Sequence, residues 1–150
     1  MTKPIVKTVT VAADPTRAFE VFTANLSEWW PGDRHSVSAG KGEVPQNVVL
    51  EPRQGGAIYE ILSDGSRTEW GVIQRWEPPA GFEMTWHPGQ GADMATRLAL
   101  QFEANGAGTQ VTLTHSGWDV MAEKAEEMSQ HYSTGWDHVL GTCFCGAFTQ

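Results

Sequence analysis

The sequence predicts an α+β protein in which a curved antiparallel sheet is covered by one long C-terminal helix. Between residues 116 and 150, apolar side chains recur at steps of three and four, which is the α-helical period. Between residues 46 and 115 apolar and polar side chains alternate instead, and turn residues separate the runs. Such a long helix needs an apolar surface to lie on, and the alternating strands are expected to supply it.

The segment before residue 46 is expected to contain one strand, two short helices and a loop. Asp14 followed by Pro15 is a typical helix start, because aspartate caps the N-terminus and proline is accepted in the first turn. Pro31-Gly32 is a typical stop signal. The predicted elements are a strand at 3–11, a helix from Pro15 with Ala18, Phe19 and Phe22 on its buried face, a short helix around 26–30, and a loop at 33–45.

Six further strands are predicted from alternation and turn signals, and their close spacing indicates an antiparallel meander. The clearest alternation places Leu98, Leu100 and Phe102 on a buried face. Two other strands are expected to carry Ala57, Tyr59 and Ile61, and Trp70, Val72 and Trp76, each set on one face. The expected strands are 46–51, 56–62, 67–76, 82–87, 97–103 and 110–115.

The C-terminal helix is predicted to begin near Ser116 or Asp119, since both are good capping residues and their spacing resembles a capping box. A helix of ~28 residues would be about 42 Å long, enough to cross a small sheet. Its expected apolar stripe is Met121, Ala125, Met128, Tyr132, Trp136, Val139, Leu140, Cys143 and Ala147.

Composition favours a single domain over residues 1–150 that can bury a sufficient core. The net charge of −8, without a run of Lys or Arg, disfavours nucleic-acid binding. No apolar run approaches the ~20 residues that a membrane span requires, so no membrane association is expected. Residues 1–4 lack the apolar core of a signal peptide.

The two cysteines, Cys143 and Cys145, are expected to be reduced thiols. At a spacing of two residues they point to different faces of a helix, which makes them a poor disulfide pair. Together with the missing signal peptide, this predicts a cytoplasmic protein.

Tryptophan is over-represented, since seven of the fifteen aromatic residues are Trp. Each indole is large and usually needs a partner for its N–H group. A wide interior accommodates such side chains more easily than a small packed core, so the composition suggests a cavity.

Motifs along nearly the whole chain resemble the START-type, helix-grip (SRPBCC) superfamily, and within it the C-terminal domain of the activator of heat-shock-protein-90 ATPase. Each motif is weak alone, but their order and spacing are fairly specific for the fold. The residues that carry the resemblance are Phe22-Thr23, Trp29-Trp30-Pro31, His35-Ser36, Glu51-Pro52-Arg53-x-Gly55-Gly56, Tyr59-Glu60, Asp64-Gly65, Trp70-Gly71, Glu77-Pro78-Pro79, Trp86, Gly108-Thr109-x-Val111-x-Leu113-x-His115, Gly117-Trp118 and Gly135-Trp136.

The resemblance implies a cavity between the long helix and the sheet, although the superfamily spans lipid carriers, hormone receptors, polyketide cyclases and co-chaperone domains. The first hypothesis is therefore a non-catalytic protein that binds a small hydrophobic or aromatic ligand. The same residues could instead fill an ordinary core. The candidate ligand-binding residues are Trp30, His35, Tyr59, Trp70, Trp86, Met128, Tyr132, Trp136 and Val139.

The second hypothesis is a cyclase-like or hydratase-like enzyme that moves protons with acids or histidines inside the cavity. Its candidates are Glu60, Glu69, His87 and His115, and the hypothesis fails if all four face solvent. Alternation with apolar neighbours favours a solvent-facing position for the charged strand residues, including Glu60. No nucleophile motif is present.

No metal or other cofactor is expected, because the five histidines lack ligand spacing. His131 and His138, for example, lie two helical turns apart, or about 10 Å.

The third hypothesis is a co-chaperone-like module that binds a protein partner, which would require a large exposed apolar patch. The related co-chaperone also has a separate N-terminal domain, for which this sequence leaves no room. Oligomeric state is left open, with Trp118 as a surface side chain that could lie in a homodimer interface.

Overall fold

Seven antiparallel strands form one curled sheet in the computed structural model, which describes residues 2–148. The order across the sheet is β1-β7-β6-β5-β4-β3-β2, so β2 to β7 form a meander and β1 returns to pair with β7. The predicted α+β fold and meander are confirmed. The strands are β1 (Ile5–Val11), β2 (Asn47–Leu50), β3 (Ala57–Ile61), β4 (Arg67–Glu77), β5 (Gly81–Trp86), β6 (Thr96–Asn105) and β7 (Gly108–Ser116).

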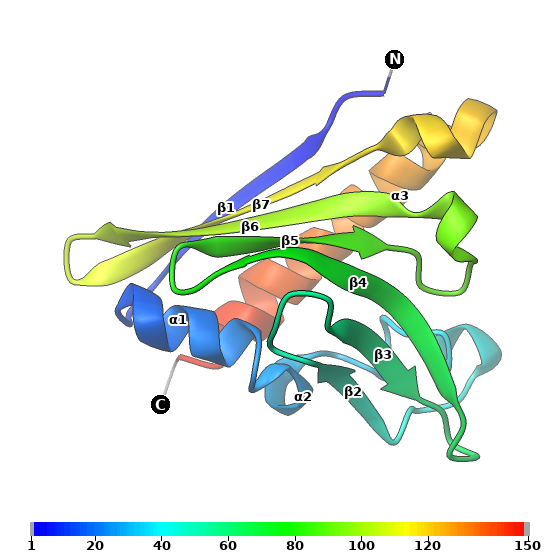
Figure 1. The fold of residues 1–150 in the computed structure, drawn as a ribbon, viewed down its shortest axis with the longest axis horizontal. Helices are drawn as coiled ribbons and strands as arrows, with labels where there is room; N and C mark the ends of the chain where they lie inside the picture. Colours follow the sequence, from blue (N-terminus) through cyan, green and yellow to red (C-terminus); the bar gives the residue numbers. More distant parts are fainter. Residues whose placement is uncertain (1, 149–150) are drawn as a thin grey trace.

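The C-terminal helical segment crosses the sheet on its concave side, behind the strands as they are drawn in Figure 1. Its buried side chains include Trp136, Val139, Leu140 and Phe144. Trp136 packs against Trp86 of the sheet, and Phe144 packs against Phe22 and Trp29 from the N-terminal helical region. The predicted arrangement of helix on curved sheet is therefore confirmed.

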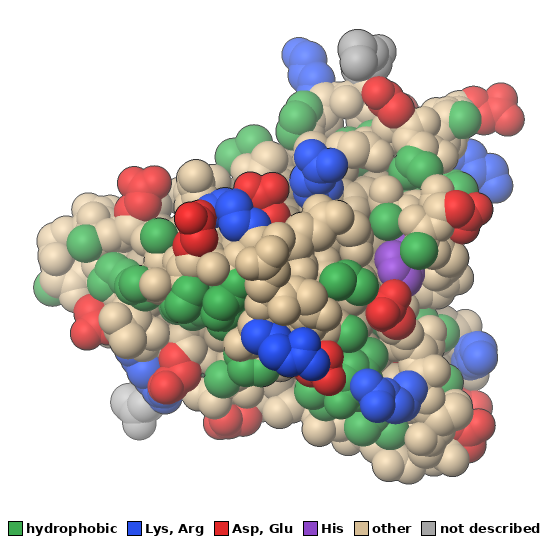
Figure 2. Space-filling view, viewed as in Figure 1, with side chains coloured by type: hydrophobic (Ala, Val, Ile, Leu, Met, Phe, Trp, Pro, Cys, Tyr) green, Lys and Arg blue, Asp and Glu red, His purple; other side chains and the backbone are tan. Residues whose placement is uncertain are grey.

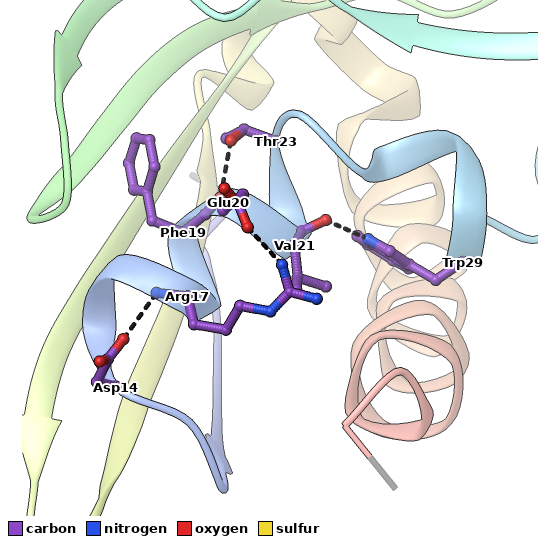
Figure 3. A network of polar contacts seen from close by, with 7 residues as sticks. All are labelled: Asp14, Arg17, Phe19, Glu20, Val21, Thr23 and Trp29. Atoms are coloured by element: carbon purple, nitrogen blue, oxygen red, sulfur yellow. Dashed lines mark hydrogen bonds and ion pairs between the residues drawn. The ribbon is translucent and has the colours of Figure 1, made fainter. Parts of the chain in front are cut away.

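Two short helices, α1 (Pro15–Phe22) and α2 (Leu26–Trp29), follow β1 as predicted. Asp14 caps α1, since its side chain accepts a hydrogen bond of 2.8 Å from the backbone N–H of Arg17. Figure 3 shows how the helices are joined, with the indole N–H of Trp29 donating to the carbonyl oxygen of Val21 at 2.8 Å. Thr23 ends α1 by donating its hydroxyl to the carbonyl oxygen of Phe19.

The C-terminal helix begins later than predicted and is not continuous. Ser116 is the last residue of β7, and neither it nor Asp119 caps the helix. A 3-10 segment, η3 (Trp118–Lys124), is interrupted at Ala122, whose φ of 51° lies outside the helical region. The regular helix α3 (Ala125–Trp136) then continues into a π-helical segment, η4 (Asp137–Phe144). Residues 149 and 150, which the prediction included, lie outside the described part of the chain.

The face assigned to β3 is the wrong one. Ile58 and Glu60 point into the interior, whereas Tyr59 is only half-buried on the outer face. The guanidinium group of Arg67 stacks 3.6 Å from the Tyr59 ring centroid on that face. Apolar residues occur on both faces of this strand, so alternation alone could not show which face is buried. The buried carboxylate of Glu60 is stable only because tertiary partners bind it.

The pairing register of β4 shifts once against β3 and once against β5, and these shifts change which of its side chains face the core. The predicted alternation along this strand therefore holds only in part. Trp70 is buried as expected, but Val72 pairs with Ala57 and is half-buried, while Ile73 faces the core. Gly71 fits the close approach of β5, because a Cβ atom there would lie 1.8 Å from the carbonyl oxygen of Thr85.

Phenylalanines fill the part of the core between α1 and the sheet. Phe19 lies 5.7 Å from Phe82 and 5.1 Å from Phe102, measured between ring centroids. Trp118 belongs to a different part of the interior. It is 2% exposed and donates its N–H to the carbonyl oxygen of His115, so the expectation that it lies on the surface is wrong.

The outer face of the sheet carries mixed charges. Figure 2 shows basic and acidic side chains interspersed over the strands, with neither sign gathered into one patch. Val6 and Val44 are the exposed large apolar side chains of residues 2–148. Cys143 and Cys145 are both free thiols, as predicted. None of the helices described has the length and apolar character needed to cross a bilayer.

Candidate functional site

A pocket of about 930 Å³ lies between the C-terminal helix, the ends of β4 and β5, and the loop that follows α2. Eight of the nine predicted ligand-binding residues line it, and Tyr59 does not, because it lies on the outer face of β3. That the eight residues bind a ligand remains a prediction. They are Trp30, His35, Trp70, Trp86, Met128, Tyr132, Trp136 and Val139.

Four of these residues form an indole cluster, which we define as Trp30, Trp70, Trp86 and Trp136. The indoles come from the end of α2, from β4, from β5 and from α3, and neighbouring ring centroids are 5.3 to 6.1 Å apart. This spacing is typical of tilted aromatic contacts. The cluster gives the pocket a rigid aromatic wall.

Three of the four indole N–H groups in the cluster have a partner. A buried N–H group without a partner loses its hydrogen bond to water, so each acceptor stabilises the position of its ring. The partners are the carbonyl oxygen of His35 for Trp30 at 2.7 Å, Oε1 of Glu60 for Trp70 at 3.1 Å, and Nδ1 of His115 for Trp136 at 3.0 Å.

The fourth indole, Trp86, has no hydrogen-bond partner. Among residues 2–148, its Nε1 is the one buried side-chain nitrogen or oxygen atom that forms no hydrogen bond. Burial raises the pKa of the neighbouring Tyr132 hydroxyl, and the Trp86 indole acts in the opposite direction. The two groups are therefore close, although the structure shows no hydrogen bond of standard geometry between them. Because Nε1 is itself buried, Trp86 contributes its ring to the pocket wall and its N–H group is not exposed there.

His115 is a neutral positioning residue. Its Nδ1 accepts from Trp136, so the ring proton is on Nε2, which lies 2.7 Å from the hydroxyl oxygen of Thr96. That hydroxyl can donate in turn to the carbonyl oxygen of Trp86 at 3.1 Å. Burial lowers the pKa of His115 to about 3. Both ring nitrogens are engaged, so His115 orients the Trp136 indole and has no free site for proton transfer.

Glu60 holds the pocket loop to the sheet. Its carboxylate accepts from the backbone N–H groups of Val37 and Ser38, each at 2.8 Å, and also from the Ser38 hydroxyl and the Trp70 indole. The side chain is 0% exposed, so these donors replace water around the buried oxygens. The arrangement fixes loop residues at the mouth of the pocket and one indole of its wall.

Five arginine, lysine and histidine side chains line the pocket, and we call them the basic rim: Arg34, His35, Lys41, His131 and His138. Nη1 of Arg34 lies 3.2 Å from Nε2 of His138, and Nδ1 of His138 lies 3.2 Å from Nε2 of His35. Burial, followed by the charges of His138, Arg34 and His131, lowers the pKa of His35, and Asp33 partly opposes this shift.

The residues proposed for acid–base chemistry do not lie in the pocket. Glu60, His87 and His115 are buried, so the condition that would eliminate the enzyme hypothesis is not met. None of them lines the pocket, however, and Glu69 is exposed on β4, where it lies 3.3 Å from His87. The expectation that Glu60 faces solvent is wrong, because four donors compensate its burial.

Sequence reasoning missed most of the basic rim and the residues that hold the indoles. Arg34 and His138 are 104 positions apart, so no local pattern could relate them. The need of each buried indole for an acceptor was a usable signal, since it implied polar residues inside the sheet. It could not identify Glu60 and His115 as those acceptors.

A family model described as Activator of Hsp90 ATPase homolog 1-like protein matches residues 12–142. This match confirms the family resemblance read from the motifs. A comparison with curated proteins found no match.

Solved structures share the fold. CalC from Micromonospora echinospora, a self-sacrificing resistance protein, is 24% identical with a TM-score of 0.68, over 97% of this chain and 93% of that chain. The Aha1 dimer from Colwellia psychrerythraea is 17% identical with a TM-score of 0.56, over 92% and 96%. Txn09, an anthrahydroquino-γ-pyrone synthase complexed with SUM, is 30% identical with a TM-score of 0.60, over 88% of each chain.

Proposed function

The chain belongs to the family of Activator of Hsp90 ATPase homolog 1-like proteins, and from this premise we propose that its pocket binds a small apolar or aromatic molecule without transforming it. The observation that carries the proposal is the indole cluster that lines a pocket of about 930 Å³, together with the polar side chains of Arg34 and His35 in the same lining. Ligand pockets are typically mostly apolar with a few placed polar groups, and this pocket has both features.

An aromatic ligand is favoured by the shape of the wall. Rings that pack against indoles gain apolar burial and edge-to-face contacts, without side-chain ordering costs when the wall is already rigid. The similarity to a synthase named for an anthrahydroquino-γ-pyrone supports a polycyclic, oxygen-bearing ligand. Arg34 and Lys41 also line the pocket and can donate to a carbonyl or phenolic oxygen on such a molecule.

The test is a thermal-shift screen of the intact protein with lipids and with oxygenated polycyclic aromatics, followed by titration of indole fluorescence. A ligand at a hundred times its dissociation constant is expected to raise the free energy of unfolding by about 2.7 kcal/mol. Failure of every library member to shift the melting temperature or to change the fluorescence would eliminate the proposal.

The substitution Trp86→Leu removes one ring of the indole cluster and keeps an apolar side chain in its place. We expect it to weaken binding of an aromatic ligand about fivefold to tenfold, because the ligand loses a ring contact in the pocket wall. Trp76→Leu is the matched control, since Trp76 packs against Phe19 outside the pocket. Equal losses in the two variants would contradict the role of Trp86.

A proton-transfer enzyme is the second candidate, favoured by the contact between His35 and His138 in the pocket. To separate the two candidates, a ligand found in the screen is incubated with the protein in deuterated water and analysed by mass spectrometry. Conversion or deuterium uptake that is lost in both His35→Gln and His138→Gln identifies an enzyme. Recovery of unchanged ligand supports a binding protein.

A protein-binding role and a homodimer remain weaker predictions. The exposed large apolar side chains Val6 and Val44 belong to different elements and form no patch of the size that the partner-binding hypothesis requires. Trp118, the side chain suggested for a dimer interface, is buried. The Aha1 dimer supports a homodimer only by similarity of fold, and light scattering of the purified protein would test it. A cytoplasmic location is likewise proposed from the sequence alone.

A further inference from the structure

The charge of the pocket is opposite to that of the protein. The chain has 18 acidic and 10 basic residues, giving a net charge of −8. Arg34, Lys41 and the three histidines of the basic rim line the pocket, whereas no Asp or Glu among residues 2–148 does. An apolar ligand would not require this separation of charge.

Arg34, His138 and His35 form a chain of hydrogen bonds, and the last histidine of this chain keeps one N–H donor. Arg34 can only donate, so Nε2 of His138 accepts from it and Nδ1 of His138 carries the proton. Nδ1 of His138 then donates to Nε2 of His35, which leaves the proton of His35 on its own Nδ1. Among residues 2–148 the structure shows hydrogen bonds of His35 through Nε2 and through its carbonyl oxygen, and none from Nδ1. The rim therefore presents a donor as well as two permanent positive charges.

The nearby acidic residues do not neutralise the rim. Asp137, next to His138 in sequence, is paired with Lys7 at 2.9 Å. The charge of Asp33 acts on His35 and on Cys143, yet Asp33 forms no ion pair within the part of the chain described and does not line the pocket. The Cys143 thiol lies 3.7 Å from Nε2 of His138. The charge of Lys41 acts on the exposed carboxylate of Asp64, whose hydrogen bonds go to Ser66. Neither Arg34 nor Lys41 forms an ion pair within residues 2–148, so both charges can act on a bound molecule.

We infer that the ligand carries an anionic group, a carboxylate in the simplest case, which Arg34, Lys41 and the N–H of His35 bind at the rim while its aromatic body lies against the indole cluster. This inference rests on the proposed function and specifies its ligand class. Charge-assisted hydrogen bonds from cations to a carboxylate are stronger than neutral ones, and an arginine fork fits the carboxylate geometry.

Two fluorescent probes of equal size test the inference with the intact protein: anthracene-2-carboxylate and anthracene-2-carboxamide. Binding of each is followed by quenching of indole fluorescence at low and at high salt. We expect the carboxylate to bind about tenfold more tightly at low salt, since only it forms charge-assisted hydrogen bonds. Its advantage should shrink as ions screen the rim.

Arg34→Gln and Lys41→Gln each remove one charge from the rim, and both side chains are exposed, so folding should be unaffected. We expect each substitution to weaken binding of the carboxylate about threefold to fivefold and to leave the carboxamide unchanged. Arg97→Gln and Lys124→Gln are the matched controls, because they change the net charge equally at exposed sites outside the pocket.

Equal affinity for the two probes, or equal effects of Arg34→Gln and Arg97→Gln, would overturn the inference and leave the proposed function intact. Failure of both probes to bind would also overturn the inference, whereas the proposed function fails only if every member of the screening library fails to bind. Selective loss of the carboxylate in the two rim variants supports the inference.

Discussion

At the scale of single residues, the site is built from indoles and the polar atoms that hold them. His115 and Glu60 are buried inside the sheet, where neither would be stable without partners. Each accepts the N–H of one indole of the wall, Trp136 and Trp70 respectively. These two indoles are therefore fixed by specific acceptors as well as by packing.

The neutral state of His115 predicts a loss of stability in mild acid. Its pKa is about 3 in the folded protein and 6.5 in a free side chain, so the unfolded chain takes up the proton first. The contribution is complete above 6.5 and declines as pH falls toward 3. From about pH 8 to about pH 5 the expected loss is about 2 kcal/mol, measurable by urea unfolding at each pH.

The control is His115→Gln, which should start less stable but lose less on acidification. His35, whose pKa is also lowered, contributes in the same direction, and His35→Gln in a separate series gives its share. An identical pH dependence in wild type and His115→Gln would contradict the assignment.

At the scale of elements, the loop and the helix start are decided by contacts distant in sequence. The loop after α2 contains only one short 3-10 turn, η1 (Ala39–Lys41), yet it is held in place through Glu60 of β3. The regular helix begins only at Ala125 because η3 is broken at Ala122, and the part of η3 before the break packs Trp118 and Met121 into the interior. Local capping signals could not anticipate that packing.

The substitution Glu60→Gln should release the loop. An amide group would place its own N–H donors against the donors of Val37, Ser38 or Trp70, leaving buried groups unsatisfied. We expect a loss of about 3 kcal/mol in unfolding free energy and faster amide hydrogen exchange at Val37 and Ser38. Glu103→Gln, an exposed change on β6, should do neither. Unchanged exchange in Glu60→Gln would show that the carboxylate does not anchor the loop.

At the scale of the whole molecule, the C-terminal helix borders both a packed region and an open one. Its Met128, Tyr132 and Val139 line the pocket, whereas its last turns meet α1 and α2. Phe144 is fully buried there, with ring centroids 5.2 Å from both Phe22 and Trp29. The packed end provides stability, so the other end can remain open.

The substitution Phe144→Ala tests this division. We expect it to reduce the unfolding free energy by about 3 to 5 kcal/mol, because it leaves a cavity where three helices meet. Val44→Ala, at a side chain 63% exposed, is the control and should change stability by at most about 0.5 kcal/mol. Urea unfolding measures both, and similar small losses would show that the helix is held mainly at the pocket.

The sequence by itself determined the fold class, the order of the elements along the chain, the start of α1 and the presence of a long helix lying on the sheet. These features depend on periodicity, capping and turn residues, which act between neighbours along the chain. It also predicted eight side chains that line the pocket, since large aromatic residues on one face of a strand or helix face the same interior.

Only the tertiary structure decided which way β3 faces, where the helix begins and which charges surround the pocket. Tyr59 and Glu60 exchange their expected faces because four donors from other segments make a buried carboxylate stable. Arg34 and His138 meet across 104 positions of sequence. Burial and charge are set by groups that become neighbours only on folding, so local pattern carries no information about them.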